Sequence, residues 1–94
     1  MKYNVCVQKR DVLMKVKSFE NFEDAYAITQ VLYYEIKRRI EKDLLIKIYK
    51  KFHKVALFHD YKDLDVIKET LEKEHCVEAG FVGPIGIFID TFED

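Results

Sequence analysis

Residues 21–43 form the longest run of this sequence in which apolar residues recur at helical spacing. Steps of three or four residues are typical of a helix that packs one face against a core. The stripe consists of Ala25, Ile28, Leu32, Ile36 and Ile40. Asn21 can cap the first turn, where Glu23 and Asp24 place negative charge near the exposed amides. The pattern predicts one long helix, on which the rest of the chain packs.

Two segments before this helix alternate between apolar and polar residues, as half-buried strands do. The first has Tyr3, Val5 and Val7 as its alternating positions, and the second has Val12, Met14 and Val16. A short polar connection, residues 8–11, separates them. Residues 1–7 and 12–19 are therefore expected to form a β-hairpin.

The segment after residue 43 fits two patterns. Leu44, Ile46 and Ile48 alternate as a strand does, while Phe52 and Ala56 would extend the stripe of the long helix. We favour strands at 44–49 and 52–59, because β-branched and aromatic residues cluster there and the alternative helix would be unusually long.

The last third of the chain predicts a shorter helix and a second hairpin. The helix spans about residues 61–74, with Asp60 or Asp63 as its cap and an apolar stripe that consists of Leu64, Ile67 and Leu71. A strand follows at 75–82, and Gly83 and Pro84 then turn the chain. Ile85, Ile87 and Ile89 alternate along the final strand.

An internal similarity supports a fold built from two strand-then-helix units. A shift of 39 positions aligns residues 15–35 with 54–74 and gives seven identities in 21 positions. Closing each unit with the next strand gives the order βαββαβ, with both helices on one face of an antiparallel sheet. We therefore predict one α+β domain over residues 1–94, a two-layer sandwich with a ferredoxin-like βαββαβ core, an extra N-terminal strand and a C-terminal hairpin strand. In that arrangement the N-terminal strand competes with the strand at 75–82 for one place, so one of the two is displaced to an edge or pairs with another copy of the chain.

Composition and charge limit the function classes. The chain is 49% apolar and 14% aromatic, with three Gly and one Pro, which suits a single core. It has no run near the ~18 apolar residues of a membrane span and no secretory block, so we expect a cytoplasmic protein without membrane contact. Residues 37–54 carry a net charge of +6 and residues 60–94 a net charge of −7. This asymmetry either steers a charged partner or is neutralised within the fold.

The sequence contains no catalytic motif, and we expect no enzyme activity and no cofactor. Cys6 and Cys76 lie seventy positions apart, and we expect both to be reduced. The spacing of His53, His59 and Cys76 matches no compact metal site, so no metal is expected.

The segment from Lys47 to Phe58 alternates lysines with aromatic residues. In the predicted sheet this segment places Tyr49, Phe52, Lys54 and Phe58 away from the helices, near Lys15 and Lys17. The candidate binding residues for a partner or a nucleic acid are thus Lys15, Lys17, Lys47, Tyr49, Lys50, Lys51, Phe52, Lys54 and Phe58. Tyr26, Tyr33 and Tyr34 lie off the helical stripe, which suits either an interface or a helix half-wrapped by its own domain.

The predicted element order resembles that of RNA-recognition-motif domains, which stack bases on an aromatic sheet face. Lys50, Phe52 and Val55 fit the third-strand signature of that family. However, Lys51 and His53 stand where the signature has small residues, and Lys54 replaces its central aromatic. Residues 12–17 supply no stacking ring, so the resemblance is one of element order only.

We expect a small non-enzymatic binding or regulatory protein that acts through protein–protein contacts, as a homodimer, on a protein partner, or both. The excess of Lys over Arg and the abundance of Ile, Tyr and Phe suggest an AT-rich genome, where phage-type or mobile-element accessory and inhibitor proteins are common. The alternative is a nucleic-acid-binding module that uses the basic and aromatic sheet face. A third hypothesis is an active site that dimerisation completes around His53 and His59.

Overall fold

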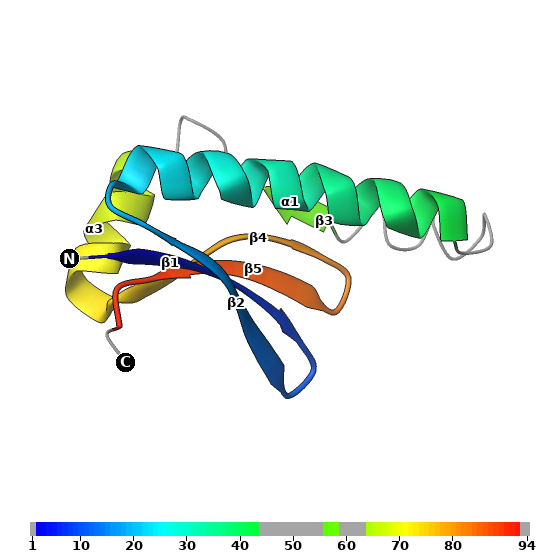
Figure 1. Ribbon diagram of the computed structural model, residues 1–94, viewed down its shortest axis with the longest axis horizontal. Helices are drawn as coiled ribbons and strands as arrows, with labels where there is room; N and C mark the ends of the chain where they lie inside the picture. The colour runs from blue at the N-terminus through cyan, green and yellow to red at the C-terminus, as the bar shows by residue number, and fades with distance from the viewer. Residues whose placement is uncertain (1, 44–55, 59–63, 93–94) are drawn as a thin grey trace.

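The structure is a computed structural model that describes residues 2–43, 56–58 and 64–92. It is a small α+β fold in which a long helix lies above an antiparallel sheet and a shorter helix lies at one end of it (Figure 1). The elements are β1 (Tyr3–Lys9), β2 (Val12–Phe19), α1 (Phe22–Asp43), β3 (Ala56–Phe58), α3 (Leu64–Glu74), β4 (Cys76–Val82) and β5 (Ile85–Asp90).

In the described part of the chain, the sheet has five strands in the order β2-β1-β5-β4-β3, and each neighbouring pair is antiparallel. Two hairpins, β1–β2 and β4–β5, supply four of the strands, and β1 pairs with β5 to join them. Consequently the first and last strands of the chain lie at the centre, while β2 and β3 form the two edges.

Each hairpin turn consists of two residues, and the first residue of each turn has a positive φ. Gly83 (φ 57°) begins the β4–β5 turn, and Arg10 (φ 56°) begins the β1–β2 turn. A two-residue turn with positive φ at its first position matches the twist of the flanking strands and is most easily adopted by glycine.

One face of the sheet and both helices build the core. Val5, Ile87 and Ile89 are fully buried, and their neighbours in each strand therefore point to the opposite, far face. Burying one such aliphatic side chain contributes about 1.5–3 kcal/mol. The side chains that meet Val5 and Ile89 are Phe22, Ala25 and Tyr26 of α1 and Ile67 and Leu71 of α3. The prediction that both helices cover the same face is therefore confirmed.

The predicted helix over residues 21–43 is confirmed, and so is its cap. The Asn21 side chain accepts a hydrogen bond from the Asp24 amide through Oδ1 at 2.9 Å. The buried face is displaced from the predicted stripe, because Tyr26, Thr29 and Tyr33 are buried while Ile28 and Leu32 are only half-buried. Tyr26 and Tyr33 do not form an outer interface. Their rings pack against Phe58, with centroid distances of 5.5 and 5.3 Å.

The ferredoxin-like strand order, with extra strands at the ends, is not observed. Either the N-terminal strand or the strand at 75–82 was expected at an edge or against another copy, yet β1 lies between β2 and β5, and β4 lies between β5 and β3. The final strand, expected as an addition, is central as well. Short turns favour local hairpin pairing, and the central position of β1 and β5 buries Val5, Ile87 and Ile89 fully beneath the helices. The expected strand at 44–49 lies outside the described residues, and of the strand at 52–59 the structure describes β3.

The second hairpin and residues 64–74 of the shorter helix agree with prediction, while its expected start and its cap at Asp60 or Asp63 lie outside the described residues. Ile67 and Leu71 are buried, and Leu64 packs beside them. His75 ends α3 with a φ of 61°, and its amide donates to the Leu71 carbonyl at 2.9 Å, a left-handed helix cap. In the described part of the chain, no helix combines the length and the apolar character needed to cross a membrane.

Candidate functional site

The edge strand β2 exposes a run of large apolar side chains. Val12, Leu13, Met14 and Val16 have exposed fractions of 59, 58, 56 and 48%. The hairpin turn extends away from α1, so the helix layer does not cover this end of β2 (Figure 1). Exposed apolar side chains on an edge strand are unusual, because unpaired backbone groups there invite another strand. This edge is the first candidate for an interaction site.

A β-bulge divides β2 into two parts. Between Val5 and Cys6 of β1 the register shifts, so that Lys17 and Lys15 are their respective partners and Val16 is the extra residue. Alternation is regular from Val12 to Lys15, where Val12 and Met14 face the helix side and Leu13 and Lys15 face the far side. The regular part of the edge is thus short and lies next to the hairpin turn.

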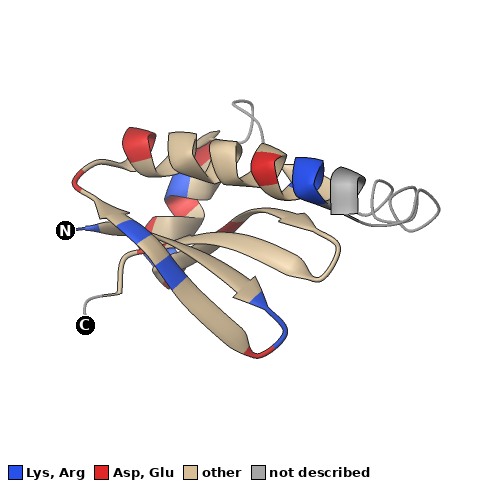
Figure 2. Cartoon of the chain, turned by 45° about the vertical axis from the view of Figure 1, so that its right-hand side comes forward, with Lys and Arg blue, Asp and Glu red and all other residues tan. Residues whose placement is uncertain are grey.

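Basic residues recur along the same hairpin. Figure 2 shows Lys and Arg on β2 and at the hairpin turn, where an acidic residue also lies. The basic residues are Lys9, Arg10, Lys15 and Lys17, and the acidic residue is Asp11. The ammonium of Lys17 lies 5.4 Å from the centroid of the Phe19 ring and so covers part of that ring.

The structure places only part of the predicted binding set. Lys15 and Lys17 are exposed on β2. Phe58 was expected to point away from the helices, and this is wrong, because its ring packs against Tyr26 and Tyr33 in the core. Large rings at a sheet edge bury more area beneath a long helix than on the far face. Lys47, Tyr49, Lys50, Lys51, Phe52 and Lys54 lie outside the described residues.

The prediction also missed the exposure of Val12 and Met14 on β2. Val12, Leu13 and Met14 were assigned to a half-buried strand, and nothing in their alternation shows that β2 ends the sheet. Lys15 and Lys17 were the available signal, because lysines are frequent on edge strands.

A buried polar cluster joins the ends of the chain on the far face. Asp90 accepts hydrogen bonds through Oδ1 from Asn4 Nδ2 at 2.7 Å and from the Phe92 amide at 3.2 Å. Its Oδ2 accepts a bond from the Cys6 thiol at 3.4 Å, and Ser18 donates to Asn4 Oδ1. Asn4 Nδ2 also donates to the Phe92 carbonyl at 2.7 Å. The cluster fixes the end of the chain to β1.

This cluster is unsuited to thiol chemistry. Burial, followed by the hydrogen bond to Asp90, raises the pKa of Cys6 to about 12, so the thiol stays protonated. Burial also raises the pKa of Cys76, with the Asp90 charge as the next cause. Both cysteines are free. In residues 2–43, 56–58 and 64–92, no group of three or more His, Cys, Asp or Glu residues could hold a metal ion.

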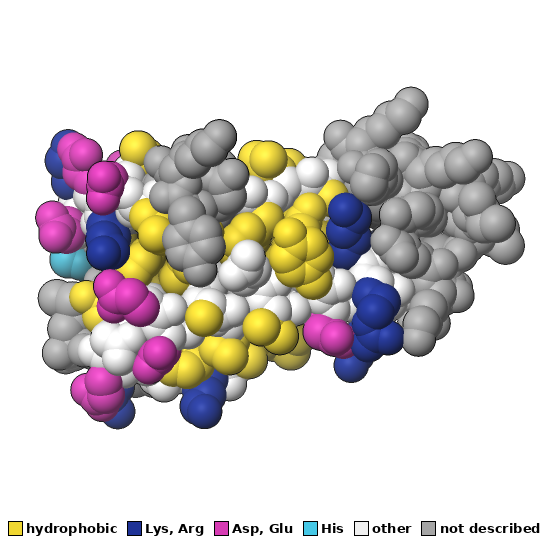
Figure 3. Space-filling model, turned by 90° about the horizontal axis from the view of Figure 1, so that it is seen from above, with side chains coloured by type: hydrophobic (Ala, Val, Ile, Leu, Met, Phe, Trp, Pro, Cys, Tyr) yellow, Lys and Arg dark blue, Asp and Glu magenta, His cyan; other side chains and the backbone are white. Residues whose placement is uncertain are grey.

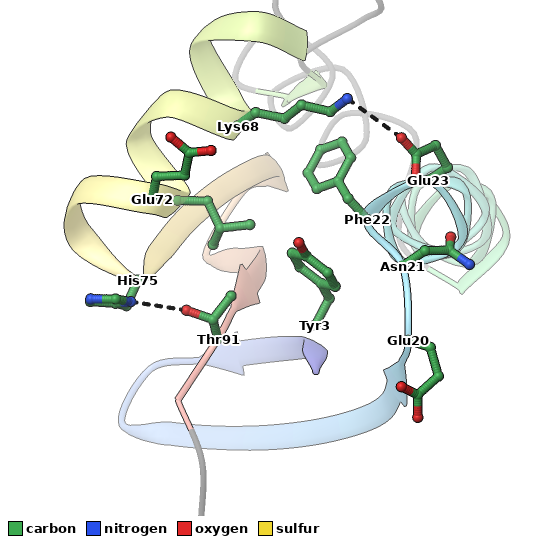
Figure 4. Close-up of a pocket in the computed structure, with 10 residues that line it drawn as sticks. Tyr3, Glu20, Asn21, Phe22, Glu23, Lys68, Glu72, His75 and Thr91 are labelled. Atoms are coloured by element: carbon green, nitrogen blue, oxygen red, sulfur yellow. Dashed lines mark hydrogen bonds and ion pairs between the residues drawn. The ribbon is translucent and has the colours of Figure 1, made fainter. Parts of the chain in front are cut away.

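A cavity of about 420 Å³ opens between the start of α1, the face of α3 and the end of β5. Figure 4 shows Tyr3 and Phe22 directed into it, with Lys68 reaching across to Glu23. The Lys68 ammonium is 3.4 Å from Glu23 Oε1 and 5.2 Å from the centroid of the Phe22 ring. At the lower wall, His75 Nδ1 lies 3.1 Å from Thr91 Oγ1.

Comparison with protein-family models, with curated proteins and with solved structures finds no match. The β2 edge and the α1–α3 cavity are therefore interpreted from their own geometry.

Proposed function

We propose that this chain is a small non-enzymatic binding protein that acts through protein–protein contacts, and that β2 pairs with β2 of a second copy. The observation that carries the proposal is the exposure of Val12, Leu13 and Met14 on an edge strand. A second copy offers the same edge, so a two-fold axis satisfies both strands at once.

The direction of the backbone groups of β2 supports one register for the proposed pairing. A two-residue hairpin turn is flanked by a hydrogen-bonded pair, here Lys9 and Val12, so the backbone N–H and C=O of Leu13 point away from β1. Placing the two-fold axis at Leu13 pairs Leu13 with its own copy. It also sets Val12 against Met14 and Asp11 against Lys15 of the second copy, and it stops short of the bulge at Val16.

This register brings together like and complementary side chains. Val12 and Met14 of both copies form one apolar cluster on the helix side, while the two Asp11–Lys15 pairs oppose unlike charges. A contact of about five residues per strand falls below the ~1,200 Å² of stable specific interfaces, so we expect a dissociation constant on the order of 10–100 μM.

Sedimentation equilibrium from 5 to 500 μM tests the proposal. The wild-type chain should pass from monomer to dimer, and Leu13→Lys should remain monomeric because two lysines would meet at the axis. The matched control is Leu57→Lys on the opposite edge strand, where Leu57 is 47% exposed, and this variant should dimerise normally. A monomeric wild type at 500 μM, or loss of the dimer only in Leu57→Lys, would overturn it.

A charge exchange tests the register. Asp11→Lys and Lys15→Asp should each weaken the dimer, and the double variant should restore it, because the opposed charges are then swapped. If the loss of dimer affinity in the double variant equals the sum of the losses in the two single variants, pairing about Leu13 is contradicted.

The nucleic-acid alternative is distinguished by fluorescence anisotropy with labelled single-stranded oligonucleotides in a salt series. Binding that falls steeply with salt and is lost in Lys15→Gln with Lys17→Gln would favour that alternative. The protein-contact proposal expects no such binding at 150 mM salt.

A further inference from the structure

The cavity between α1 and α3 combines an aromatic floor with an acidic rim. Its floor includes Tyr3 and Phe22, whose rings meet edge to face with a centroid distance of 6.1 Å and an interplanar angle of 80°. Leu71 of α3 completes the apolar part. Aromatic faces attract cations, and the apolar surface accommodates an aliphatic stem.

The charges around this floor are mainly negative. Glu23 of α1 and Glu72 of α3 stand on the two sides of the opening, and Glu20 lies at the rim (Figure 4). Among the residues that the structure describes, Lys68 is the one lysine or arginine that lines the cavity, and it pairs with Glu23. Within the described residues, neither Glu20 nor Glu72 takes part in an ion pair. The cavity thus has more carboxylate charge than its own lysine neutralises.

Lys68 itself shows how a cation sits at this site. Glu72 is four residues away on the same helix, yet the Lys68 ammonium reaches to Glu23 and lies over the Phe22 ring. The amide of Glu23, and then Lys68, lower the pKa of the Glu23 carboxyl, so it remains charged beside the cation. Seen from above, this end of the molecule presents acidic and basic side chains together, beside a more apolar middle (Figure 3).

We propose that this cavity binds an organic cation, an ammonium or guanidinium group on an apolar stem. The stem lies against Tyr3, Phe22 and Leu71, and the charged end lies between Glu72 and the Lys68–Glu23 pair. The cavity volume of about 420 Å³ lies within the range of small-ligand sites and admits one such group. The cation is either a free small molecule or the Lys or Arg side chain of another protein. The site is independent of the β2 edge.

Heteronuclear NMR titration tests the site with three probes: n-butylguanidinium, neutral 1-pentanol and the capped peptide acetyl-Gly-Arg-Gly-amide. Such small ligands should bind with dissociation constants on the order of 1–10 mM. The guanidinium probe should produce saturable shifts around residues 20–23, 68–72 and 91, and 1-pentanol should not. Tighter binding of the peptide indicates a protein side chain as the source, whereas tighter binding of the free cation indicates a small molecule.

Paired variants give effects in opposite directions. Glu72→Gln should weaken binding about two- to fivefold, because one carboxylate is lost. Lys68→Met should strengthen it by a similar factor, because the competing ammonium is removed and Glu23 is released. The matched control is Glu69→Gln, on the same helix but paired with Lys73 at 2.9 Å outside the cavity, and it should leave the affinity unchanged.

Three results would overturn the proposal. The first is the absence of saturable chemical-shift changes with the guanidinium probe. The second is an equal loss of affinity for the probe in Glu69→Gln and Glu72→Gln. The third is weaker binding of the probe by Lys68→Met than by the wild type. The β2 variant Leu13→Lys should bind the probe as the wild type does, so failure of the dimer and failure of this site are distinguishable.

Discussion

Asn4 and Asp90, 86 positions apart, are joined by a hydrogen bond of 2.7 Å between Asn4 Nδ2 and Asp90 Oδ1. Both side chains are buried on the far face of the sheet, where β1 and β5 pair. Asp90 also accepts bonds from the Cys6 thiol and from the Phe92 amide. One carboxylate therefore holds together the first strand, the last strand and the end of the described chain.

Asp90→Ala should lower the free energy of unfolding by about 2–4 kcal/mol, because it leaves the Cys6 thiol and one of the two N–H groups of the Asn4 amide without an acceptor. Urea denaturation followed by circular dichroism measures this change. Asp11→Ala, at an exposed turn, is the control and should stay within about 0.5 kcal/mol. Similar small losses in both variants would show that the cluster contributes little to stability.

Cys6 should make the stability depend on pH in the alkaline range. Its pKa is raised from about 9 to about 12 in the folded chain, so the folded thiol keeps a proton that the unfolded thiol loses. The contribution is fully present below about pH 9 and is lost as the pH rises toward 12. Urea denaturation at pH 8 and pH 10.5 should show a larger loss for the wild type than for Cys6→Ala. Equal losses would contradict the raised pKa.

The β1–β2 turn should be stabilised by glycine at its first position. Arg10 holds a φ of 56°, where Gly83 stands in the equivalent turn of β4–β5. Arg10→Gly should raise the free energy of unfolding by about 0.5–1 kcal/mol, since release of the left-handed strain exceeds the added chain entropy. Asp11→Gly in the same turn is the control and should lower it by about 0.5–1 kcal/mol. Thermal denaturation measures both, and a loss in Arg10→Gly would refute the argument.

Two tyrosines of α1 should differ sharply in their contribution to stability. Tyr26 is buried against Phe22 and Phe58, whereas Tyr34 is 58% exposed and meets Tyr33 edge to face. Tyr26→Ala should cost about 3–5 kcal/mol, and Tyr34→Ala about 1 kcal/mol or less. Comparable costs in chemical denaturation would mean that the buried face of α1 is not centred on Tyr26.

The orientation of α1 shows what the periodicity of apolar residues can predict and what it cannot. The stripe through Ala25 and Ile28 predicted a helix and placed its buried face approximately. The apolar stripe could not show whether Ile28 or Tyr26 is more deeply buried, because a tyrosine is equally suited to a core and to an interface. The choice depended on Phe58, more than thirty residues later, whose ring lies between Tyr26 and Tyr33.

The candidate sites were less predictable than the elements. The exposure of Leu13 follows from the position of β2 at the sheet edge, and the cavity arises where Tyr3, Phe22 and Leu71 converge from three elements. Neither relationship has a signal in local spacing.

The sequence by itself determined the local elements: the helix capped at Asn21, the shorter helix with Ile67 and Leu71 on its buried stripe, and two hairpins that turn within residues 8–11 and at residues 83–84. These depend on backbone periodicity, capping and turn chemistry within a few residues. Only the tertiary structure decided the strand order, which put β1 and β5 at the centre and left β2 exposed. Strand order depends on which apolar strands gain most from burial beneath both helices, and that is a comparison across the whole chain.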